Sequence, residues 1–133
     1  MKMERSSFQE NGQMTTMNDK VPLIYDVWQF EFVYEDQPNK FKKRPIIIGA
    51  IDEDYVLALI VKVTSHEPRE DYPGEVTIED WKEAGLEKKS TARCSKTMLV
   101  PVEAFSKFKY YGHLSERDSE KVASMLINLG YIS

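Results

Sequence analysis

Residues 25–33 read YDVWQFEFV and give the clearest indication of the fold class. The large apolar side chains in this stretch fall on every second residue, at Trp28, Phe30 and Phe32. A period of two is typical of a β-strand with one buried face, because successive side chains point to opposite sides of the strand. We therefore expect a strand here, with its aromatic side chains facing a core.

Strand character continues downstream. Residues 44–51, RPIIIGAI, are rich in β-branched side chains, which favour strands. Residues 52–54 predict a tight turn into a further apolar run at residues 55–65, so the two runs predict a hairpin. Residues 34–44 lie ahead of this hairpin and combine proline, asparagine and mixed charge, and we expect a long exposed loop there.

The middle of the chain is less regular. Residues 66–76, HEPREDYPGEV, contain two prolines, a glycine and several carboxylates, and predict an acidic insert without regular structure. Thr77 and Asp80 have the spacing of a capping box, ahead of a short helix that Gly85 can end. Strand character returns in two later stretches, residues 91–100 (TARCSKTMLV) and 108–114 (FKYYGHL).

The last segment predicts an amphipathic helix. Ser115 stands at the N-cap position and Asp118 at the third helical position. Gly130 supplies a stop signal. The apolar residues recur at helical spacing and would form one stripe: Val122, Met125, Leu126 and Leu129.

These elements predict a mainly β fold. We expect a small curled sheet or barrel, with a short inserted helix and a C-terminal amphipathic helix packed against it. Residues 1–20 are polar and lack an apolar period, so we expect a flexible N-terminal tail. Residues 21–133 are then a single domain, long enough to bury one core.

Composition narrows the class of function. The 133 residues carry a net charge of −4 and one cysteine, Cys94. A single cysteine excludes an internal disulfide, a cysteine-based zinc site and a CxxC redox pair, and it suits a reducing compartment. No apolar run approaches the roughly 20 residues that span a bilayer, and the first 20 residues lack the apolar stretch of a signal peptide. We expect a cytoplasmic protein without a membrane segment.

Positive charge is nevertheless clustered in two segments. The residues are Lys40, Lys42, Lys43 and Arg44 in the first and Lys88, Lys89, Arg93 and Lys96 in the second. If the two segments meet in space, they would create a local field for a phosphate backbone, and Lys42 and Lys43 are candidate RNA-binding residues on this ground. The alternative is a solvated surface whose charges serve solubility.

Four short motifs occur in order between Tyr25 and Leu129. They are YDVWQFEF with a charged segment and KKRPIIIGAI, then VKVTSH, then STARCSKT, and last GHLSERDSEKV. Together they resemble the MazF/PemK family of toxins from type II toxin–antitoxin systems, and STARCSKT is similar to the Arg-Cys-Asp segment of the Kid/PemK branch. The resemblance implies a homodimer of SH3-like barrels that cleaves single-stranded RNA without a metal or cofactor and is neutralised by a cognate antitoxin.

The resemblance also implies which residues act. Arg44 matches the arginine of the family's Arg-Pro pair, Thr64 matches its strand-end threonine, and Arg93 matches the arginine of Arg-Cys-Asp. When the 2'-hydroxyl of RNA attacks the neighbouring phosphorus, a protein must position the groups, stabilise charge and move protons. A guanidinium suits the phosphate, and the threonine hydroxyl can hold a phosphate oxygen or orient the sugar. Arg93 would be a second phosphate clamp or the acid.

Ser95 departs from the family pattern, because the Kid/PemK branch has an aspartate there. A serine has no acidic proton near neutral pH and cannot replace a carboxylate in general acid–base catalysis. His66, two residues after Thr64, is a candidate replacement because imidazole titrates near neutral pH. Its alternative is a surface histidine. Ser65 and Ser95 are expected to contact RNA.

Two other functions stay open from the sequence. One is a non-catalytic RNA- or protein-binding module on the same barrel, which the serine at position 95 favours. The other is a protein-contact role for the acidic insert at residues 66–76.

Overall fold

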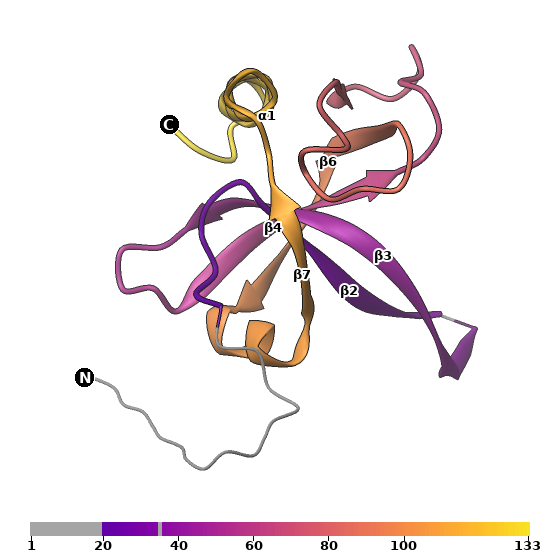
Figure 1. Ribbon diagram of the computed structural model, residues 1–133, viewed down its shortest axis with the longest axis vertical. Coiled ribbons are helices and arrows are strands. Elements are labelled where there is room, and N and C mark those ends of the chain that lie inside the picture. The colour runs from indigo at the N-terminus through magenta and orange to yellow at the C-terminus, as the bar shows by residue number, and fades with distance from the viewer. Residues whose placement is uncertain (1–19, 35) are drawn as a thin grey trace.

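Six antiparallel strands form one curled sheet in the computed structural model, which describes residues 20–34 and 36–133 (Figure 1). The order across the sheet is β5-β6-β4-β3-β2-β7. Apart from Lys20, the predicted N-terminal tail lies outside the described residues. The elements are β2 (Asp26–Tyr34), β3 (Gln37–Ile51), β4 (Leu57–Thr64), β5 (Glu75–Ile78), β6 (Ser90–Pro101), the 3₁₀-helix η1 (Val102–Lys107), β7 (Lys109–His113) and α1 (Glu116–Asn128).

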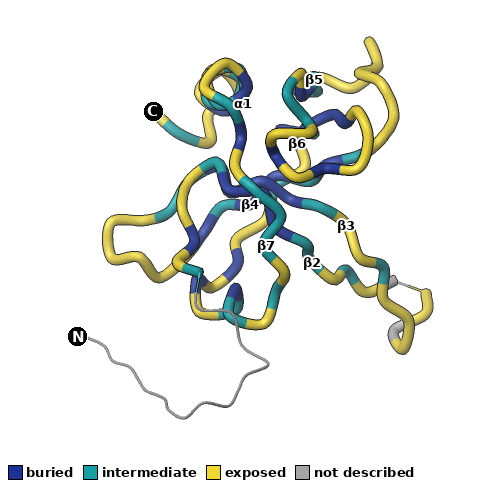
Figure 2. The backbone as a smooth tube through the Cα atoms, viewed as in Figure 1, coloured by how far each residue is buried: buried dark blue, intermediate teal, exposed yellow. Residues whose placement is uncertain are grey.

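The sheet is a half-barrel, with β5 and β7 at its edges. It curls enough to enclose apolar side chains on both faces, and Figure 2 shows the buried residues gathered where the strands cross at the centre. One cluster contains Trp28, Ile46, Ile60 and Phe105. The other contains Val27, Ile47, Val61 and Leu126. The mainly β prediction is therefore confirmed, although the sheet does not close into a barrel.

The first strand agrees with its pattern only in part. Trp28 is fully buried, whereas Phe30 and Phe32 are half-buried at the edge of the same cluster. Val27, on the other face, is fully buried as well. Because the sheet is covered on both sides here, a period of two does not distinguish its faces.

The predicted loop at residues 34–44 is wrong. β3 begins at Gln37 and pairs with β2, so most of this segment belongs to a long hairpin that projects from the body of the sheet (Figure 1). The ladder satisfies the backbone groups of this segment, although its side chains are mostly polar and the apolar Phe41 is exposed. The polar composition predicted a loop because the outer part of the hairpin faces solvent, and a strand there needs no alternation of apolar residues.

The predicted short helix after Thr77 is also wrong. Thr77 lies in β5 opposite Thr91, and residues 79–85 form turns. Asp80, the second residue of the expected capping box, binds the start of α1 instead. The Asp80 carboxylate accepts hydrogen bonds from the Ser115 hydroxyl at 2.6 Å and from Arg117.

The C-terminal helix is confirmed as α1. The Ser115 side chain caps it by accepting a hydrogen bond from the backbone N–H of Asp118. Val122 and Leu126 are fully buried against the sheet. Gly49 of β3 allows this packing, because a Cβ there would come within 2.7 Å of the Leu126 side chain.

Candidate functional site

Two rows of residues cross the sheet on the face that α1 does not cover. In the first row, Ile46 of β3 pairs with Lys62 of β4, Lys62 with Arg93 of β6, and Arg93 with Glu75 of β5. In the second row, Thr64 pairs with Thr91, and Thr91 with Thr77. Arg44 lies two residues before Ile46, and Thr64 lies two residues after Lys62. Antiparallel pairing therefore brings Arg44 and Thr64 to the same end of neighbouring strands and to the same face.

Arg44 and Thr64 differ in exposure. Arg44 is exposed and pairs with Phe30 of β2 through the backbone. Its guanidinium makes no hydrogen bond or ion pair within residues 20–34 and 36–133. Thr64 is half-buried at the end of β4. By alternation, the sequence-predicted arginine and threonine thus belong to the same face of the sheet, and the arginine is exposed on it.

Lys62 is a site residue that the motifs did not reveal. It lies in the first row next to Arg93, and its ammonium is 4.8 Å from the centre of the Phe32 ring. The ring of Phe32 lies 4.8 Å from that of Phe30 in turn. Alternation in β4 is the signal that could have found this lysine, because Lys62 shares a face with Thr64. Basic and aromatic side chains are therefore interleaved on this face.

Arg93 is held by a carboxylate. Its Nε donates a hydrogen bond to Glu75 Oε2 at 3.1 Å, and Arg69 Nη2 donates to the same oxygen at 3.2 Å. The backbone N–H of Arg69 donates to the other oxygen at 2.9 Å. Burial acts to raise the pKa of Glu75, but the hydrogen bonds from Arg69 and the charges of both arginines outweigh it and lower that pKa. Glu75 is thus an ionised carboxylate that fixes Arg93.

His66 and Ser65 lie just beyond the end of β4, and both are exposed. The backbone carbonyl of His66 accepts a hydrogen bond from the Thr91 hydroxyl. Both residues line a small cavity of about 120 Å³ together with Thr77, Lys89 and others. The structure therefore brings His66 beside the second row, next to the strand that ends at Thr64.

The two predicted lysines of β3 lie on opposite faces. Lys42 pairs with Phe32 and shares the face of Arg44, whereas Lys43 pairs with Glu31 and points to the other side of the hairpin. The two basic clusters are separated by β4, which lies between β3 and β6. By alternation, Lys42, Arg44 and Arg93 belong to one face, with Lys62 of β4 between them.

Ser95 lies in a bulge of β6. The pairing with β4 jumps from Lys62–Arg93 to Val61–Thr97, so residues 94–96 are extra on the β6 side. The bulge lies against the insert, since the Cys94 N–H donates to the Gly74 carbonyl at 2.9 Å. Burial raises the pKa of the Cys94 thiol to about 12, so this cysteine is not a reactive thiolate.

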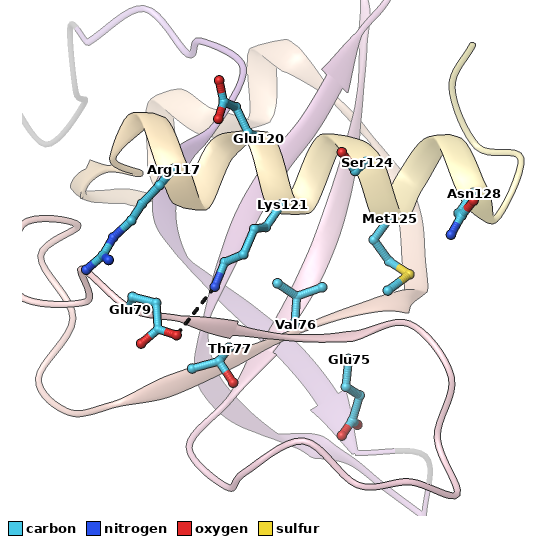
Figure 3. A pocket seen from close by; sticks show the side chains of 10 residues that line it. All are labelled: Glu75, Val76, Thr77, Glu79, Arg117, Glu120, Lys121, Ser124, Met125 and Asn128. Carbon is cyan, nitrogen blue, oxygen red and sulfur yellow. Dashed lines mark ion pairs between the residues drawn. The ribbon is translucent and has the colours of Figure 1, made fainter.

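A wider depression of about 740 Å³ lies between β5 and α1, at the edge of the sheet where the two rows end at Glu75 and Thr77 (Figure 3). Its charged side chains are of both signs, and Lys121 of α1 lies 3.6 Å from Glu79. It contains none of the sequence-predicted catalytic residues. Within the described ranges, no three His, Cys, Asp or Glu side chains are grouped so as to hold a metal ion.

Comparison with known proteins decides the family. The model of the PemK-like, MazF-like toxins of type II toxin–antitoxin systems matches residues 24–129. The chain belongs to this toxin family. The match covers every strand and the whole of α1, so both rows of site residues lie inside it. A search of curated protein sequences gives no match.

Solved structures support the fold of this PemK/MazF-like chain. A crystal structure of MazE-MazF from Deinococcus radiodurans has a TM-score of 0.64 at 16% identity and covers 86% of this chain and 100% of its own. MazF from the same organism has a TM-score of 0.62 at 17% identity with the same coverages. An endoribonuclease from a mycobacterial species has a TM-score of 0.59 at 12% identity, covering 82% of this chain and 90% of its own. At these identities the likeness concerns the fold.

The helices of this PemK/MazF-like chain do not suggest a membrane segment: across residues 20–34 and 36–133, none is both long and apolar enough to cross a bilayer.

Proposed function

We propose that this PemK/MazF-like toxin is a metal-independent endoribonuclease that cleaves single-stranded RNA by 2'-hydroxyl attack. The observation that carries the proposal is the shared open face of Arg44, Thr64, Lys62 and Arg93, with Phe32 beside them. Guanidinium and ammonium groups bind the phosphate backbone, and aromatic rings stack on unpaired bases. Family membership and the fold shared with a mycobacterial endoribonuclease support the same conclusion.

In this reaction the protein forms no covalent bond to the RNA. A bond forms between the 2'-oxygen and phosphorus, and the bond from phosphorus to the 5'-oxygen breaks, leaving a 2',3'-cyclic phosphate and a 5'-hydroxyl. Negative charge grows on the phosphate oxygens during attack. Arg44 is placed to stabilise this charge with its fork of donors, and the Thr64 hydroxyl to hold a phosphate oxygen or orient the ribose.

Two proton transfers complete the reaction: the 2'-hydroxyl loses a proton and the 5'-oxygen gains one. We propose His66 for one of them, because its loop starts beside Thr91 and an imidazole can accept or donate near neutral pH. Glu75 does not serve as the base, since two arginines stabilise its ionised form. Ser65 and Ser95 border this region and contribute hydrogen bonds to RNA.

A non-catalytic RNA-binding module is the second candidate. The serine at position 95 favours it, because the bulge of β6 carries no carboxylate where the Kid/PemK branch has an aspartate. In that case the basic face would retain RNA and leave the phosphodiester intact.

The proposed partners are a second copy of the chain and a cognate antitoxin, acting in the cytoplasm. Leu57 and Leu99 are exposed on the α1 side of the sheet, and Ile127 is exposed on α1 itself. Exposed aliphatic side chains of this kind are typical of an interface, and a second copy would cover them. The mycobacterial endoribonuclease with a similar fold forms a complex with its cognate antitoxin, and we propose an analogous partner here.

The proposal is tested by incubating the protein with mixed single-stranded RNA in EDTA. We expect cleavage products with a 5'-hydroxyl and a cyclic phosphate. Arg44→Ala and Thr64→Ala should each lower the rate on the order of 10²-fold, the effect of removing one group that stabilises the transition state. Arg117→Ala and Thr97→Ala are matched controls on the α1 side of the molecule and should retain the wild-type rate. Binding without cleavage would favour the non-catalytic module.

A further inference from the structure

The insert supplies a second arginine beside Arg93. Arg69 and Arg93 donate to the same oxygen of Glu75, at 3.2 and 3.1 Å, so their guanidinium groups are neighbours. The Glu75 side chain is only 2% exposed, whereas those of Arg69 and Arg93 are 39% and 23% exposed. The carboxylate is thus enclosed beneath two arginines that both reach the surface.

The ring of Tyr72 packs against both Arg69 and Arg93. Its ring centre lies 3.9 Å from the Arg69 guanidinium carbon and 5.7 Å from that of Arg93. A guanidinium stacked on a ring keeps the N–H groups at its edge free for hydrogen bonds. Tyr72 therefore holds Arg69 flat and fixes the insert next to β6.

The charges of this cluster do not cancel. Two guanidinium groups share one carboxylate, so one positive charge remains. Arg93 uses Nε for Glu75, and its two terminal nitrogens donate to no acceptor within the described part of the chain. The insert's other carboxylates, Glu67, Glu70 and Asp71, are exposed and form no ion pair with Arg69 or Arg93. Two adjacent guanidinium edges with a net positive charge match a phosphate diester.

We propose that Arg69 and Arg93 form a second phosphate subsite, which binds a phosphate of the RNA neighbouring the one at Arg44 and Thr64. This rests on the proposed function. β4 separates β3 from β6, and Arg44 lies two residues along its strand from the row that contains Arg93, so the two backbones are roughly 12 Å apart. That separation leaves room for a second phosphate beside the one at Arg44 and Thr64. The insert is consequently part of the RNA site, and the negative charge of Glu75, which lies beneath the two arginines, opposes a bound phosphate.

The test measures binding of a fluorescein-labelled 2'-O-methyl RNA, which cannot undergo 2'-hydroxyl attack, by anisotropy over a series of salt concentrations. Arg69→Gln should weaken binding roughly three- to tenfold and reduce the slope of log K against log salt by about 0.7, the value for one phosphate contact on a single strand. Arg69→Lys should restore the slope and part of the affinity. Arg117→Gln is the matched control, because Arg117 lies on α1 and is paired with Asp80. This variant should change neither the affinity nor the salt slope.

Glu75→Gln separates a direct role of Arg69 from a merely structural one. With the carboxylate charge removed and both arginines kept, affinity should rise. If affinity falls instead, Arg69 acts by holding the insert folded and the subsite is overturned. An unchanged affinity and slope in Arg69→Gln, while Arg44→Ala weakens binding, would also overturn it and leave the proposed function standing. If neither variant weakens binding, the proposed function itself fails.

Discussion

Lys62 lies at the centre of the basic face, and a neighbouring aromatic ring holds its side chain in place. The ammonium lies against the face of Phe32, while its backbone neighbours are Ile46 on one strand and Arg93 on the other. A cation held over a ring loses little freedom when an anion arrives, because its position is already fixed. Lys62 is therefore expected to contribute more to RNA binding than a lysine free in solvent.

We predict that Lys62→Met, which retains the aliphatic stem, lowers the affinity for 2'-O-methyl RNA roughly tenfold and reduces the salt dependence by about one phosphate contact. Lys107→Met removes an exposed lysine of η1 and serves as the control. Anisotropy titration over a range of salt concentrations measures both quantities. A salt slope equal to that of the wild type would exclude a phosphate contact at Lys62.

For His66 the expected signature is in the pH profile. If it transfers a proton, His66→Ala should lower the cleavage rate about 10²-fold or more and remove one ionisation near neutrality from the rate–pH curve. His113→Ala is the control, since His113 ends the edge strand β7, where its Nδ1 lies 2.8 Å from Asp26 Oδ1 of β2. Rates that are unchanged in His66→Ala from about pH 5 to 8 would remove it from the mechanism.

Some of the site could be predicted from the sequence and some could not. Arg44 and Thr64 were identified by resemblance, and alternation fixes which neighbours in a strand share their face. Their meeting depends on the register between β3 and β4, which no local pattern contains. Arg69 and Glu75 were missed because their pairing is a contact within an irregular loop, where neither helical nor strand periodicity applies.

At the start of α1, one group of hydrogen bonds joins the helix to the turns that follow β5. Asp80, from the turns after β5, accepts hydrogen bonds from Ser115 and Arg117, while the Asp118 carboxylate accepts from the backbone N–H groups of Glu79 and Asp80. Carboxylates near a helix N-terminus also interact favourably with its dipole. The turns and the helix thus stabilise each other.

This contact makes stability depend on pH. The hydrogen bonds from Arg117 and then Ser115 lower the pKa of Asp80 from 3.8 to about 2. A folded-state pKa below the unfolded value adds stability that is complete above the unfolded value and is lost as pH falls through the folded one. We therefore predict that Asp80→Asn destabilises the protein at neutral pH, and that the difference from wild type shrinks between about pH 4 and 2.

Urea unfolding at several pH values, with an NMR titration of the Asp80 carboxyl group, checks this prediction. Asp54→Asn changes an exposed carboxylate in the β3–β4 turn and provides the control. A difference between wild type and Asp80→Asn that stays constant down to about pH 2 would contradict the assigned pKa.

The elements differ in how well their sequences predict them. α1 was predicted because its cap, its apolar stripe and its stop signal agree with one another. The structure confirms the cap, the buried Val122 and Leu126 and the end of the helix before Gly130, whereas Leu129 of the expected stripe is exposed. The outer part of the β2–β3 hairpin was missed because most of its side chains are polar and its few apolar ones, such as Val33 and Phe41, are exposed. The helix after Thr77 was wrong because the same polar residues satisfy a tertiary contact, which a local pattern cannot distinguish from a cap.

For the whole molecule, the two faces of the half-barrel differ in character. The face with Arg44 and Lys62 is basic, whereas the α1 face ends in exposed aliphatic side chains near Leu99, which is 62% exposed. Since Leu99 pairs with Leu59, it shares the face that α1 covers further along the sheet. Dimerisation through this face would leave both basic faces open to RNA.

We predict that Leu99→Asp weakens self-association on the order of tenfold or more, as expected for an apolar residue near the centre of an interface. Met98→Asp, the adjacent residue on the opposite face, should leave association unchanged. Sedimentation velocity over a range of protein concentrations distinguishes the two variants. A wild-type protein that remains monomeric throughout would rule out this face as a dimer contact.

The open sheet leaves two strands whose outer backbone groups can recruit another chain. β5 has only four residues and β7 five, and a fibril needs a longer flat edge to grow. Lys109 on β7, together with Lys121 and Glu79 flanking β5, adds charges that disfavour stacking of identical copies. The short and charged edges of the half-barrel therefore disfavour polymerisation through its own sheet.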